Sequence, residues 1–486
     1  MKSRDWPPRA GRFPRRSVDP PSPTVVGYLR EILTMFIGDT RLGAEIMNPN
    51  NRRNFLKIAS GAVAGASLLI RRAGAASAIE TVRVGVVGLN GRGNDHITGF
   101  AALPNVEIAA LCDVDENVLN RRVEEHKNLF KHPVKPYVDY REMLKDPDID
   151  VISIATPNHW HALMGIWACQ AGKDVYVEKP CSHNVFEGRQ LVEAARKYNR
   201  VVQHGTQSRS CEALREGIEL LREGYIGEVY YAKGLCYKWR DTIGRAPVSG
   251  VPQGVHYDLW TGPAPLKPFT QNRFHYNWHW QWDYGNGDIG NQGVHEMDVA
   301  RWGLGVAFPT LIEAQGGHFM FDDDQETPNT MVATFKYPEQ NKMLVFEVRH
   351  WMTNNELGEI NEPPHVVGCL FLGSKGYMTT HGFNRGYQAY LGRDGQKGKG
   401  RRGGEDHYAN FIQAVRARDR NLLNAEIEEG HISAALCHLA NAAFRVQRAL
   451  RFDPATQCVI GDPEADGIIQ GKARAYRAPF TVPEEI

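Results

Sequence analysis

A glycine-rich turn and a carboxylate about 20 residues after it have the types and spacing that bind a dinucleotide. The apolar run from Val82 to Val87 predicts a buried strand, and Gly88-Leu89-Asn90-Gly91-Arg92-Gly93 follows it, before a predicted helix from about Asp95 to Ala102. Backbone amides at such a turn, with the dipole of the helix start, meet the charge of a pyrophosphate. Asp113 ends a second predicted strand, where its carboxylate could accept both ribose hydroxyls.

Two details of this motif leave alternatives open. The second glycine of the usual pattern falls on Asn90, with Gly91 after it. Asp113 could instead cap the helix that follows, although Asp115 is itself a suitable cap. The residues just after Asp113 include no Arg or Lys to receive a 2′-phosphate, so NAD is expected and NADP is less favoured.

Two further loops carry polar groups at the ends of predicted strands. Thr156-Pro157-Asn158-His159-Trp160-His161 follows the run Val151 to Ile154, and Glu178-Lys179-Pro180 follows the run Asp174 to Val177. Strands that alternate with helices predict a parallel sheet, and ligands of such sheets bind at the carboxyl ends of the strands. Both loops are therefore expected at one edge.

In their order and spacing these motifs resemble those of the Gfo/Idh/MocA oxidoreductases, a family that includes glucose-fructose oxidoreductase and inositol dehydrogenase. The resemblance covers about residues 81 to 450. It implies that Lys179 contacts the nicotinamide ribose and the reacting hydroxyl, while Glu178 acts with Lys179 to hold the cofactor. The cofactor-binding residues assigned by motif and resemblance are Gly88, Asn90, Gly91, Arg92, Gly93, Asp113, Thr156, Asn158, His161, Glu178 and Lys179.

The resemblance also implies a helix whose Asp and His project into the site four residues apart. The matching segment is 287–298, where His295 stands at the family histidine and Asn291 replaces the usual aspartate. Residues three and four apart share a helix face, so Asn291, His295 and Asp298 are expected to converge near the substrate. Asparagine carries no charge and would stabilise an imidazolium less than aspartate does.

Oxidation of a secondary alcohol requires removal of the hydroxyl proton as hydride leaves the carbon. We expect His295 to be the proton acceptor and Lys179 to polarise the hydroxyl. The reverse assignment, with a deprotonated Lys179 as the base, is also open.

An aromatic residue stands at every even position from Phe274 to Tyr284. In an extended chain these rings would share one face, with polar side chains on the other. Such a surface suits sugars, which have apolar faces and many hydroxyls, and Trp280 and Trp282 are its expected substrate contacts. A half-buried strand that packs its rings into a core or a subunit interface explains the pattern equally well.

The elements that position these residues predict an α/β chain with two domains. A Rossmann dinucleotide-binding domain is expected over residues 79–205, and a substrate and oligomerisation domain with an open mixed, mostly antiparallel sheet over residues 206–486. The strand-like and helical runs of the second domain are Thr330 to Tyr337, Met343 to His350, Val366 to Leu372, His407 to Ala417 and His431 to Leu450. The glycine-rich, basic stretch from Gly386 to Gly404 is expected to be a mobile surface loop.

The N-terminal region has the features of an export signal rather than of a folded domain. Residues 1–50, rich in Pro and Arg, are expected to be disordered or a mis-assigned extension, with Met35 or Met47 as an alternative start. Residues 51–78 resemble a twin-arginine signal, which implies export to the periplasm by the twin-arginine machinery with the cofactor already bound. Its apolar stretch of about thirteen residues is shorter than the ~20 that span a bilayer, so no stable span is expected after cleavage, and an uncleaved anchor is the alternative.

Bulk composition narrows the classes of partner. The net charge of +1 gives no general attraction to nucleic acid or to an anionic membrane. The eight cysteines lack the paired spacing of a zinc site, so they are expected to be small buried residues, and no metal site is predicted. A homo-oligomer is expected from the family resemblance.

Three functions follow from these observations. The first is a dehydrogenase that transfers hydride between a secondary hydroxyl of a sugar or polyol and a tightly bound nicotinamide cofactor. The second is an NAD-dependent, redox-neutral glycoside hydrolase, a class found in related families. The third is a sugar-binding protein on the same fold, against which the presence of Lys179 and His295 argues.

Overall fold

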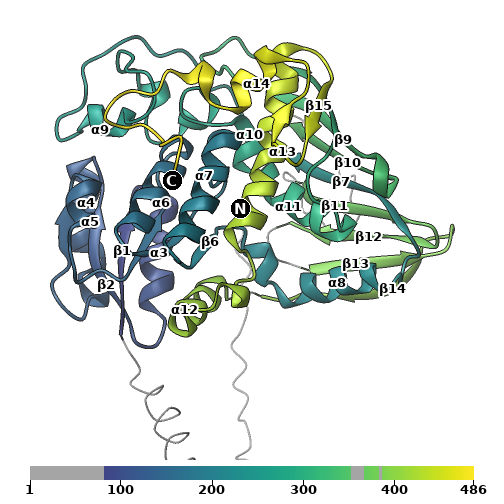
Figure 1. The fold of residues 1–486 in the computed structure, drawn as a ribbon, viewed down its shortest axis with the longest axis horizontal. Coiled ribbons are helices and arrows are strands. Elements are labelled where there is room, and N and C mark those ends of the chain that lie inside the picture. Colours follow the sequence, from purple (N-terminus) through teal and green to yellow (C-terminus); the bar gives the residue numbers. More distant parts are fainter. Residues whose placement is uncertain (1–80, 352–365, 383–385, 405) are drawn as a thin grey trace, which may run out of the picture. The chain divides into compact units, whose positions relative to one another are not determined.

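A computed structural model describes residues 81–351, 366–382, 386–404 and 406–486 (Figure 1). The segments 1–50 and 51–78, for which an extension and an export signal are predicted, lie outside the described residues. Within the described residues the chain forms two sheets, one parallel and one mixed. The prediction of an α/β fold with a Rossmann sheet followed by a mostly antiparallel sheet is therefore confirmed.

The first sheet has six strands in the order β3-β2-β1-β4-β5-β6, all parallel. Its strands are β1 (Val82–Val87), β2 (Val106–Cys112), β3 (Lys135–Tyr137), β4 (Val151–Ile154), β5 (Asp174–Val177) and β6 (Val202–His204). The strand order reverses between β1 and β4. Ligands of open parallel sheets bind at such a switch point, outside the carboxyl ends of the strands.

Helices connect these strands and bury their apolar faces against the sheet. They are α3 (Arg92–Ala101), α4 (Glu116–His126), α5 (Tyr140–Leu144), α6 (Asn158–Gln170) and α7 (Val185–Lys197). Helix α3 begins three residues earlier than predicted. Gly91 is its N-cap, so the helix starts inside the glycine-rich turn.

The second sheet has ten strands in the order β14-β13-β12-β11-β7-β10-β9-β8-β15-β16. Its strands are β7 (Val229–Tyr237), β8 (Leu311–Gly317), β9 (Thr330–Tyr337), β10 (Lys342–Arg349), β11 (Val366–Gly373), β12 (Gly376–His381), β13 (Gly386–Leu391), β14 (Gln396–Arg401), β15 (Leu450–Asp453) and β16 (Cys458–Val459). Only the β7–β10 pair is parallel among these described strands. The three strands expected at 330–337, 343–350 and 366–372 are β9, β10 and β11.

Helices cover one side of this second sheet (Figure 1). The helices of this half are α8 (Glu212–Arg222), α9 (Tyr257–Thr261), α10 (Gly287–Asn291), α11 (Gly293–Leu304), α12 (His407–Ala417), α13 (Ile427–Val446) and α14 (Pro463–Ile469). Helix α12 has the predicted bounds, whereas α13 begins and ends four residues earlier than predicted.

Three local predictions were wrong. The single helix expected over 287–298 is two helices, α10 and α11, which meet at Gln292. The aromatic segment 274–284 is not an extended strand, because residues Asn277–Trp280 form a 3₁₀ turn, η6. The glycine-rich stretch 386–404 contains the paired strands β13 and β14 rather than an irregular loop, and Tyr387 packs in the core.

After β14 the chain returns to the Rossmann half through α12 and α13, and the last two strands of the second sheet, β15 and β16, follow them. Helix α13 packs against both α7 and β8, so it lies between the two halves (Figure 1). Phe411 and Ile412 of α12 belong to the core around β1 and α3, and Phe480 and Val482 belong to the core around β4 and α6. Among the described residues, no helix combines the length and apolar character that crossing a bilayer requires.

Candidate active site

A cavity of about 500 Å³ lies at the carboxyl ends of the parallel strands and is lined by residues of both halves. It brings together twelve of the residues predicted from the sequence: Gly88, Asn90, Gly91, Arg92, Asp113, Thr156, Asn158, His161, Glu178, Lys179, Asn291 and His295. These residues come from the segments that follow β1, β2, β4 and β5 and from the junction between α10 and α11. Their placement is the one that the parallel sheet predicts.

The glycine-rich turn has the backbone that a dinucleotide requires. Gly88 has φ +83°, and a Cβ there would lie 2.7 Å from the backbone of Ala155. A Cβ on Gly93 would lie 2.0 Å from the carbonyl oxygen of Gly88, so this glycine lets α3 pack closely on the strand. Around Gly91, by contrast, the space where a Cβ would stand is open within 4 Å, which leaves room for a ligand beside the helix start.

Asp113 lies at the end of β2 and braces the same turn. Its carboxylate accepts hydrogen bonds from the backbone N–H of Leu89 at 2.7 Å and of Asp115 at 2.9 Å. Asp115, not Asp113, caps α4 by accepting from the N–H of Asn117. Burial raises the pKa of Asp113 to about 6, so ribose hydroxyls that donate to its ionised form would stabilise that form.

The loop after β4 enters α6 with Asn158 as the first helical residue. The side-chain oxygen of Asn158 is buried and has no hydrogen-bond partner among the described residues, although it lines the cavity. Such an orphaned acceptor fits a ligand that donates a hydrogen bond. Together with the open space at Gly91 and the carboxylate of Asp113, it shows that these residues suit a dinucleotide.

His161 holds two of the lining loops together. Its Nε2 lies 2.7 Å from the carbonyl oxygen of Thr156, and its Nδ1 lies 2.7 Å from that of Pro180. The ring therefore ties the loop after β4 to the loop after β5. Burial lowers the pKa of His161.

Glu178 is the centre of a buried polar cluster. Its Oε1 accepts from Arg92 Nε at 3.0 Å, contacts His96 Nε2 at 3.1 Å and accepts from Gln207 Nε2 at 3.2 Å. Burial alone would raise its pKa, but Arg92 and His96 hold the pKa well below its usual range. An ionised Glu178 thus fixes the start of α3 relative to the strand that carries Lys179.

Lys179 points at the break between α10 and α11. Its Nζ donates to the backbone carbonyl of Asn291 at 2.6 Å and lies 3.4 Å from the side-chain oxygen of Asn291. The N–H of His295 bonds to the carbonyl of Gln292 rather than to that of Asn291, so the break frees the Asn291 carbonyl for the lysine. Burial lowers the pKa of Lys179.

The charge that Asn291 lacks is supplied one helical turn earlier by Asp288, which the sequence reasoning missed. The amide of Asn291 donates to Asp288 Oδ1 at 3.1 Å. The carboxylate also accepts from Arg240 Nε at 2.9 Å and contacts His350 Nε2 at 2.9 Å. Burial would raise the pKa of Asp288, but Arg240 and His350 hold it well below its usual range.

His295 lies at the start of α11 and lines the cavity with Lys179. Burial and the nearby charge of Lys179 hold the pKa of His295 well below its usual range. The imidazole is therefore neutral near pH 7 and can accept a proton.

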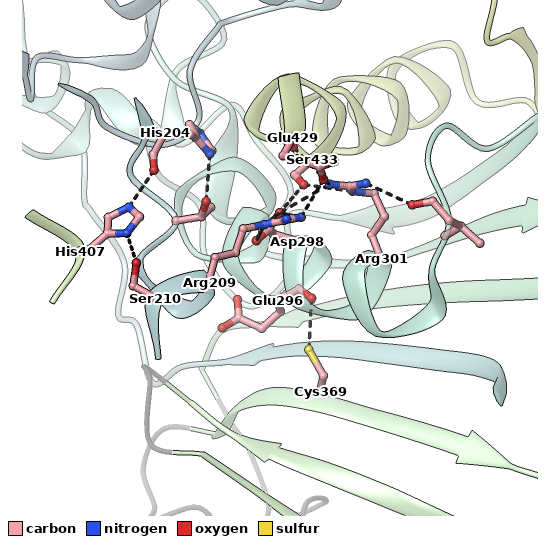
Figure 2. A network of polar contacts seen from close by, with 12 residues as sticks. His204, Arg209, Ser210, Glu296, Asp298, Arg301, Cys369, His407, Glu429 and Ser433 are labelled. Atoms are coloured by element: carbon pink, nitrogen blue, oxygen red, sulfur yellow. Dashed lines mark hydrogen bonds and ion pairs between the residues drawn. The ribbon is translucent and has the colours of Figure 1, made fainter. Parts of the chain in front are cut away.

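Asp298 does not converge with Asn291 and His295, which corrects the prediction. It is fully buried, and Figure 2 shows it among Arg209, Arg301 and Ser433. Arg209 donates to both of its oxygens, from Nε at 2.8 Å and from Nη2 at 2.9 Å, and Ser433 donates at 2.6 Å. Asp298 is therefore bound by Arg209 and by Ser433 of α13 and is absent from the cavity lining, which His295 of the same helix reaches.

Trp280 and Trp282 do not line the cavity either. Trp280 is 2% exposed, with the Arg240 guanidinium 4.9 Å from its ring centre, and Trp282 is covered by Arg445. Their neighbours Tyr276, Trp278 and His279 line the cavity instead. Aromatic residues at every second position share a face only in an extended chain. Because residues Asn277–Trp280 form the 3₁₀ turn η6, their spacing does not determine which rings face the site.

Other lining residues were also missed, notably Lys238, Arg240 and Gln292. Lys238 and Arg240 are alternate residues of a Lys-Trp-Arg run that directly follows β7, and this run was the sequence signal for them. Among the described residues, no group of three His, Cys, Asp or Glu side chains is arranged to hold a metal ion.

Comparisons with known proteins agree with this architecture. A sequence model described as an oxidoreductase family with an NAD-binding Rossmann fold matches residues 82–206. A second model, the C-terminal alpha/beta domain of the same oxidoreductase family, matches residues 228–324 and 400–481.

Two curated relatives share part of the chain. A glycosyl hydrolase family 109 protein of Shewanella sp. (strain MR-4) is 33% identical over 213 residues, which are 38% of this chain and 46% of the relative. An alpha-N-acetylgalactosaminidase of Shewanella oneidensis is 33% identical over 215 residues, with the same coverage of 38% and 46%. The chain thus spans about half the length of these relatives.

Solved structures share the fold at low sequence identity. The WlbA dehydrogenase of Bordetella pertussis, in complex with NADH and UDP-GlcNAcA, has a TM-score of 0.57 and 19% identity, covering 77% of this chain and 99% of that one. A levoglucosan dehydrogenase in complex with NADH and levoglucosan has a TM-score of 0.59 and 17% identity, covering 76% and 99%. With both family models placed on the two halves described above, the chain belongs to the Gfo/Idh/MocA family of NAD-dependent oxidoreductases.

Proposed function

We propose that this protein transfers hydride between a secondary hydroxyl of a sugar or polyol and a nicotinamide cofactor that it retains. The observation that carries the proposal is the meeting of Lys179 and His295 in one cavity with the glycine-rich turn and Asp113. NAD, when bound along that turn, supplies the hydride acceptor. The residues at the α10–α11 break would then act on the hydroxyl.

His295 is the proposed proton acceptor and Lys179 the proposed stabiliser of the alkoxide. A neutral imidazole takes the hydroxyl proton, and the ammonium of Lys179 stabilises negative charge on the oxygen as hydride leaves the carbon. The ammonium of Lys179 donates to the backbone carbonyl of Asn291, which holds it at the reacting end of the cavity. A deprotonated Lys179 as the base stays the alternative, because burial lowers the pKa of this lysine.

The cavity suits a sugar. The rings of Tyr276 and Trp278 offer apolar faces, and the amides of Asn291 and Gln292 offer donors and acceptors on its lining. Trp278 is held in place because its indole N–H donates to the carbonyl of His275 at 2.9 Å.

A redox-neutral glycoside hydrolase is the second candidate, and the names of the two curated relatives favour it. In that reaction the hydride removed from the sugar is returned to it after the glycosidic bond has broken. The same base and the same stabilising lysine would serve both reactions.

One experiment separates these candidates. The purified protein is denatured to identify bound nucleotide, and the native protein is incubated with sugars, polyols and aryl glycosides. Accumulation of NADH supports the dehydrogenase, and release of the aglycone without net reduction supports the hydrolase. A protein with neither bound NAD nor either reaction would refute both candidates and leave the sugar-binding alternative.

We further propose that residues 51–78 direct export through the twin-arginine machinery and that the mature chain assembles as a homo-oligomer. The arginine pair and the small-residue end of the segment support export. Replacing Arg52 and Arg53 with lysine should retain the protein in the cytoplasm, as fractionation would show. Light scattering of the mature chain at a monomer mass would contradict the oligomer.

A further inference from the structure

His279 lines the active-site cavity with Lys179 and His295, and the proposed reaction does not use it. It belongs to the 3₁₀ turn η6. Burial, together with the nearby charge of Lys179, lowers the pKa of His279 to about 3. The imidazole is therefore neutral near pH 7.

The turn determines which nitrogen of this ring carries the hydrogen. Nδ1 of His279 lies 2.5 Å from the backbone carbonyl oxygen of Tyr276, which also accepts from the backbone N–H of His279 at 3.3 Å. A carbonyl oxygen can only accept, and a neutral imidazole has a hydrogen on one of its two nitrogens. Nδ1 is therefore the donor, and Nε2 has a lone pair.

This lone pair is available to a ligand. Among the described residues, none forms a hydrogen bond with Nε2 of His279. In the same part of the chain the partnerless Nδ1 atoms of His159 and His438 are enclosed by protein, whereas Nε2 of His279 is not. Nε2 thus reaches open space, and the cavity is the open space that His279 lines.

Neighbouring aromatic rings hold the imidazole in place. It stacks on Trp278, with ring centres 3.6 Å apart and 21° between the planes, and the ring centre of Tyr276 lies 4.8 Å away. Because the ring is already fixed, little side-chain entropy is lost when a ligand binds to it.

The other polar side chains at this end of the cavity mainly offer hydrogens. Lys179, Lys238 and Arg240 carry only donors. The side-chain oxygens of Asn291 and Gln292 already accept from the two lysines, at 3.4 and 2.6 Å. A sugar hydroxyl donates as well as accepts, so its hydrogen needs an acceptor, and the imidazole provides one.

We propose that His279 binds a second hydroxyl of the substrate, which donates its hydrogen to Nε2, while Lys179 and His295 act on the hydroxyl that is oxidised. This inference rests on the proposed oxidation. It narrows the substrate class to sugars and polyols with a free hydroxyl at the second position. A fluoro, ether or keto group at that position could not donate, and a site built around a donated hydrogen bond discriminates against such analogues.

The test uses the full-length protein with its bound cofactor. Steady-state kcat/KM is measured for glucose, galactose, mannose and myo-inositol, and for the monodeoxy and monodeoxyfluoro derivatives of each. A fluoro group has nearly the size of a hydroxyl but no hydrogen to donate. The comparison therefore finds the positions at which a donor is needed.

Three variants link such a position to the imidazole. His279→Ala removes the acceptor, His279→Gln retains an acceptor oxygen, and Asn277→Ala is the matched control. Asn277 lies in the same turn and is absent from the cavity lining, and its amide bonds to Asn272 at 3.4 Å.

At one position other than the oxidised one, the fluoro derivative should lower kcat/KM of the wild type by about 10- to 100-fold, as when a buried acceptor is left without its partner. His279→Ala should lower kcat/KM for the parent compound by a similar factor and remove the difference between parent and derivative, because one bond cannot be lost twice. His279→Gln should retain part of the difference. Asn277→Ala should leave it unchanged.

Nitrogen-15 NMR of histidine-labelled protein gives a readout that does not depend on turnover. The signals of His279, identified by their loss in His279→Gln, should show a protonated Nδ1 and an unprotonated Nε2 from pH 5 to 9. A protonated Nε2 would overturn the inference.

The kinetic outcomes separate this inference from the proposed function. Turnover in which every fluoro derivative matches its parent, or in which His279→Ala lowers kcat/KM for parent and derivative equally, would overturn the role of His279 and leave the proposed oxidation intact. A protein without bound NAD and without turnover of any sugar or polyol would refute the proposed function, and this inference with it.

Discussion

A single side-chain difference at position 291 is explained by the residue one turn before it. In an otherwise familiar site Asn291 replaces an aspartate, and its amide donates to the buried carboxylate of Asp288. An aspartate at 291 could not donate this bond and would place two carboxylates in contact. The negative charge has in effect moved to Asp288, where Arg240 and His350 balance it.

The variant Asn291→Asp should therefore be less stable and should respond differently to pH. Loss of the bond to Asp288 should cost about 1–3 kcal/mol of unfolding free energy. The added charge beside Lys179 should raise the pKa of His295, so the acidic limb of the kcat/KM profile should move to higher pH. Asn291→Ala is the control, since it should lower stability without that move. An unchanged acidic limb in Asn291→Asp would contradict the proposed role of His295.

We propose that ribose hydroxyls donate to the ionised form of Asp113. Because burial raises the pKa of this carboxyl to about 6, binding of NAD should then weaken as the pH falls below about 6. The raised pKa also means that this group makes the unliganded protein less stable as pH rises from about 4 to 6. Titration of NAD binding across this range checks the first sign, and unfolding of the NAD-free protein across the same range checks the second. Asp113→Asn should bind NAD more weakly and lose the pH dependence, so an identical profile in that variant would exclude Asp113.

Asp298 should matter for folding rather than for turnover. Removing one partner of a buried ion pair costs about 3–5 kcal/mol, so Asp298→Leu should lower the denaturant midpoint strongly. The double variant Asp298→Leu with Arg209→Met should recover part of that loss, because no buried charge is then left alone. A stable Asp298→Leu protein that is catalytically impaired would restore Asp298 to the substrate site.

At the scale of elements, the sequence predicted regular segments better than breaks in them. Strand β9 and helix α12 have the predicted bounds because their apolar periodicity follows the sheet or helix they occupy. The break at Gln292 was missed because Gly290 and Gly293 stand in a helical pattern. A Cβ on Gly293 would lie 2.3 Å from the Phe346 ring, so this glycine lets the start of α11 lie against the second sheet.

The same distinction holds for the candidate site. Ligand residues at strand ends, such as Asp113 and Lys179, were predictable because parallel strands share an edge. Lys238 and Arg240 were not, because they reach the cavity through the pairing of β7 with β10, which joins residues more than a hundred positions apart. The position of Trp278 in the site was not predicted, because it lies in a 3₁₀ turn and the alternating aromatic pattern predicts an extended strand.

The segment after α14 should control how firmly the nucleotide is held. Phe480 lines the cavity and packs on Trp160 with ring centres 5.3 Å apart, and Arg141 and Arg477 lie over its ring. Phe480→Ala should speed the release of NADH about tenfold or more, as loss of a buried aromatic wall suggests. Cofactor fluorescence in stopped flow measures the release rate.

A matched control is Phe452→Ala, which removes an equally buried ring from the core of the second sheet. It should lower stability and leave the release rate unchanged. Equal release rates in wild type and Phe480→Ala would show that the segment does not hold the nucleotide.

On the scale of the whole molecule, the two halves depend on each other for their cores. Phe411 and Ile412 complete the core of the Rossmann half, although they lie far beyond its last strand in the sequence. Ile427 and Ala434 of α13 fill a second part of that core. The boundary near residue 205 separates the sheets but not the hydrophobic interiors.

A fragment of residues 79–205 should therefore fail to unfold cooperatively, whereas residues 79–486 should melt in one transition. Circular dichroism of both proteins on heating would show this. The fragment lacks the side chains that bury β1 and α3, so it exposes apolar surface that folding would otherwise cover. A sharp melting transition in the isolated fragment would refute the dependence.

The packing of α13 against both α7 and β8 has a consequence for how the nucleotide enters. A hinge that swung the halves apart would have to pull a buried helix out of two interiors at once, so wide opening is costly. Movement of the short stretch around Phe480, which lines the cavity, would leave α13 in both hydrophobic interiors and is the easier route for nucleotide entry.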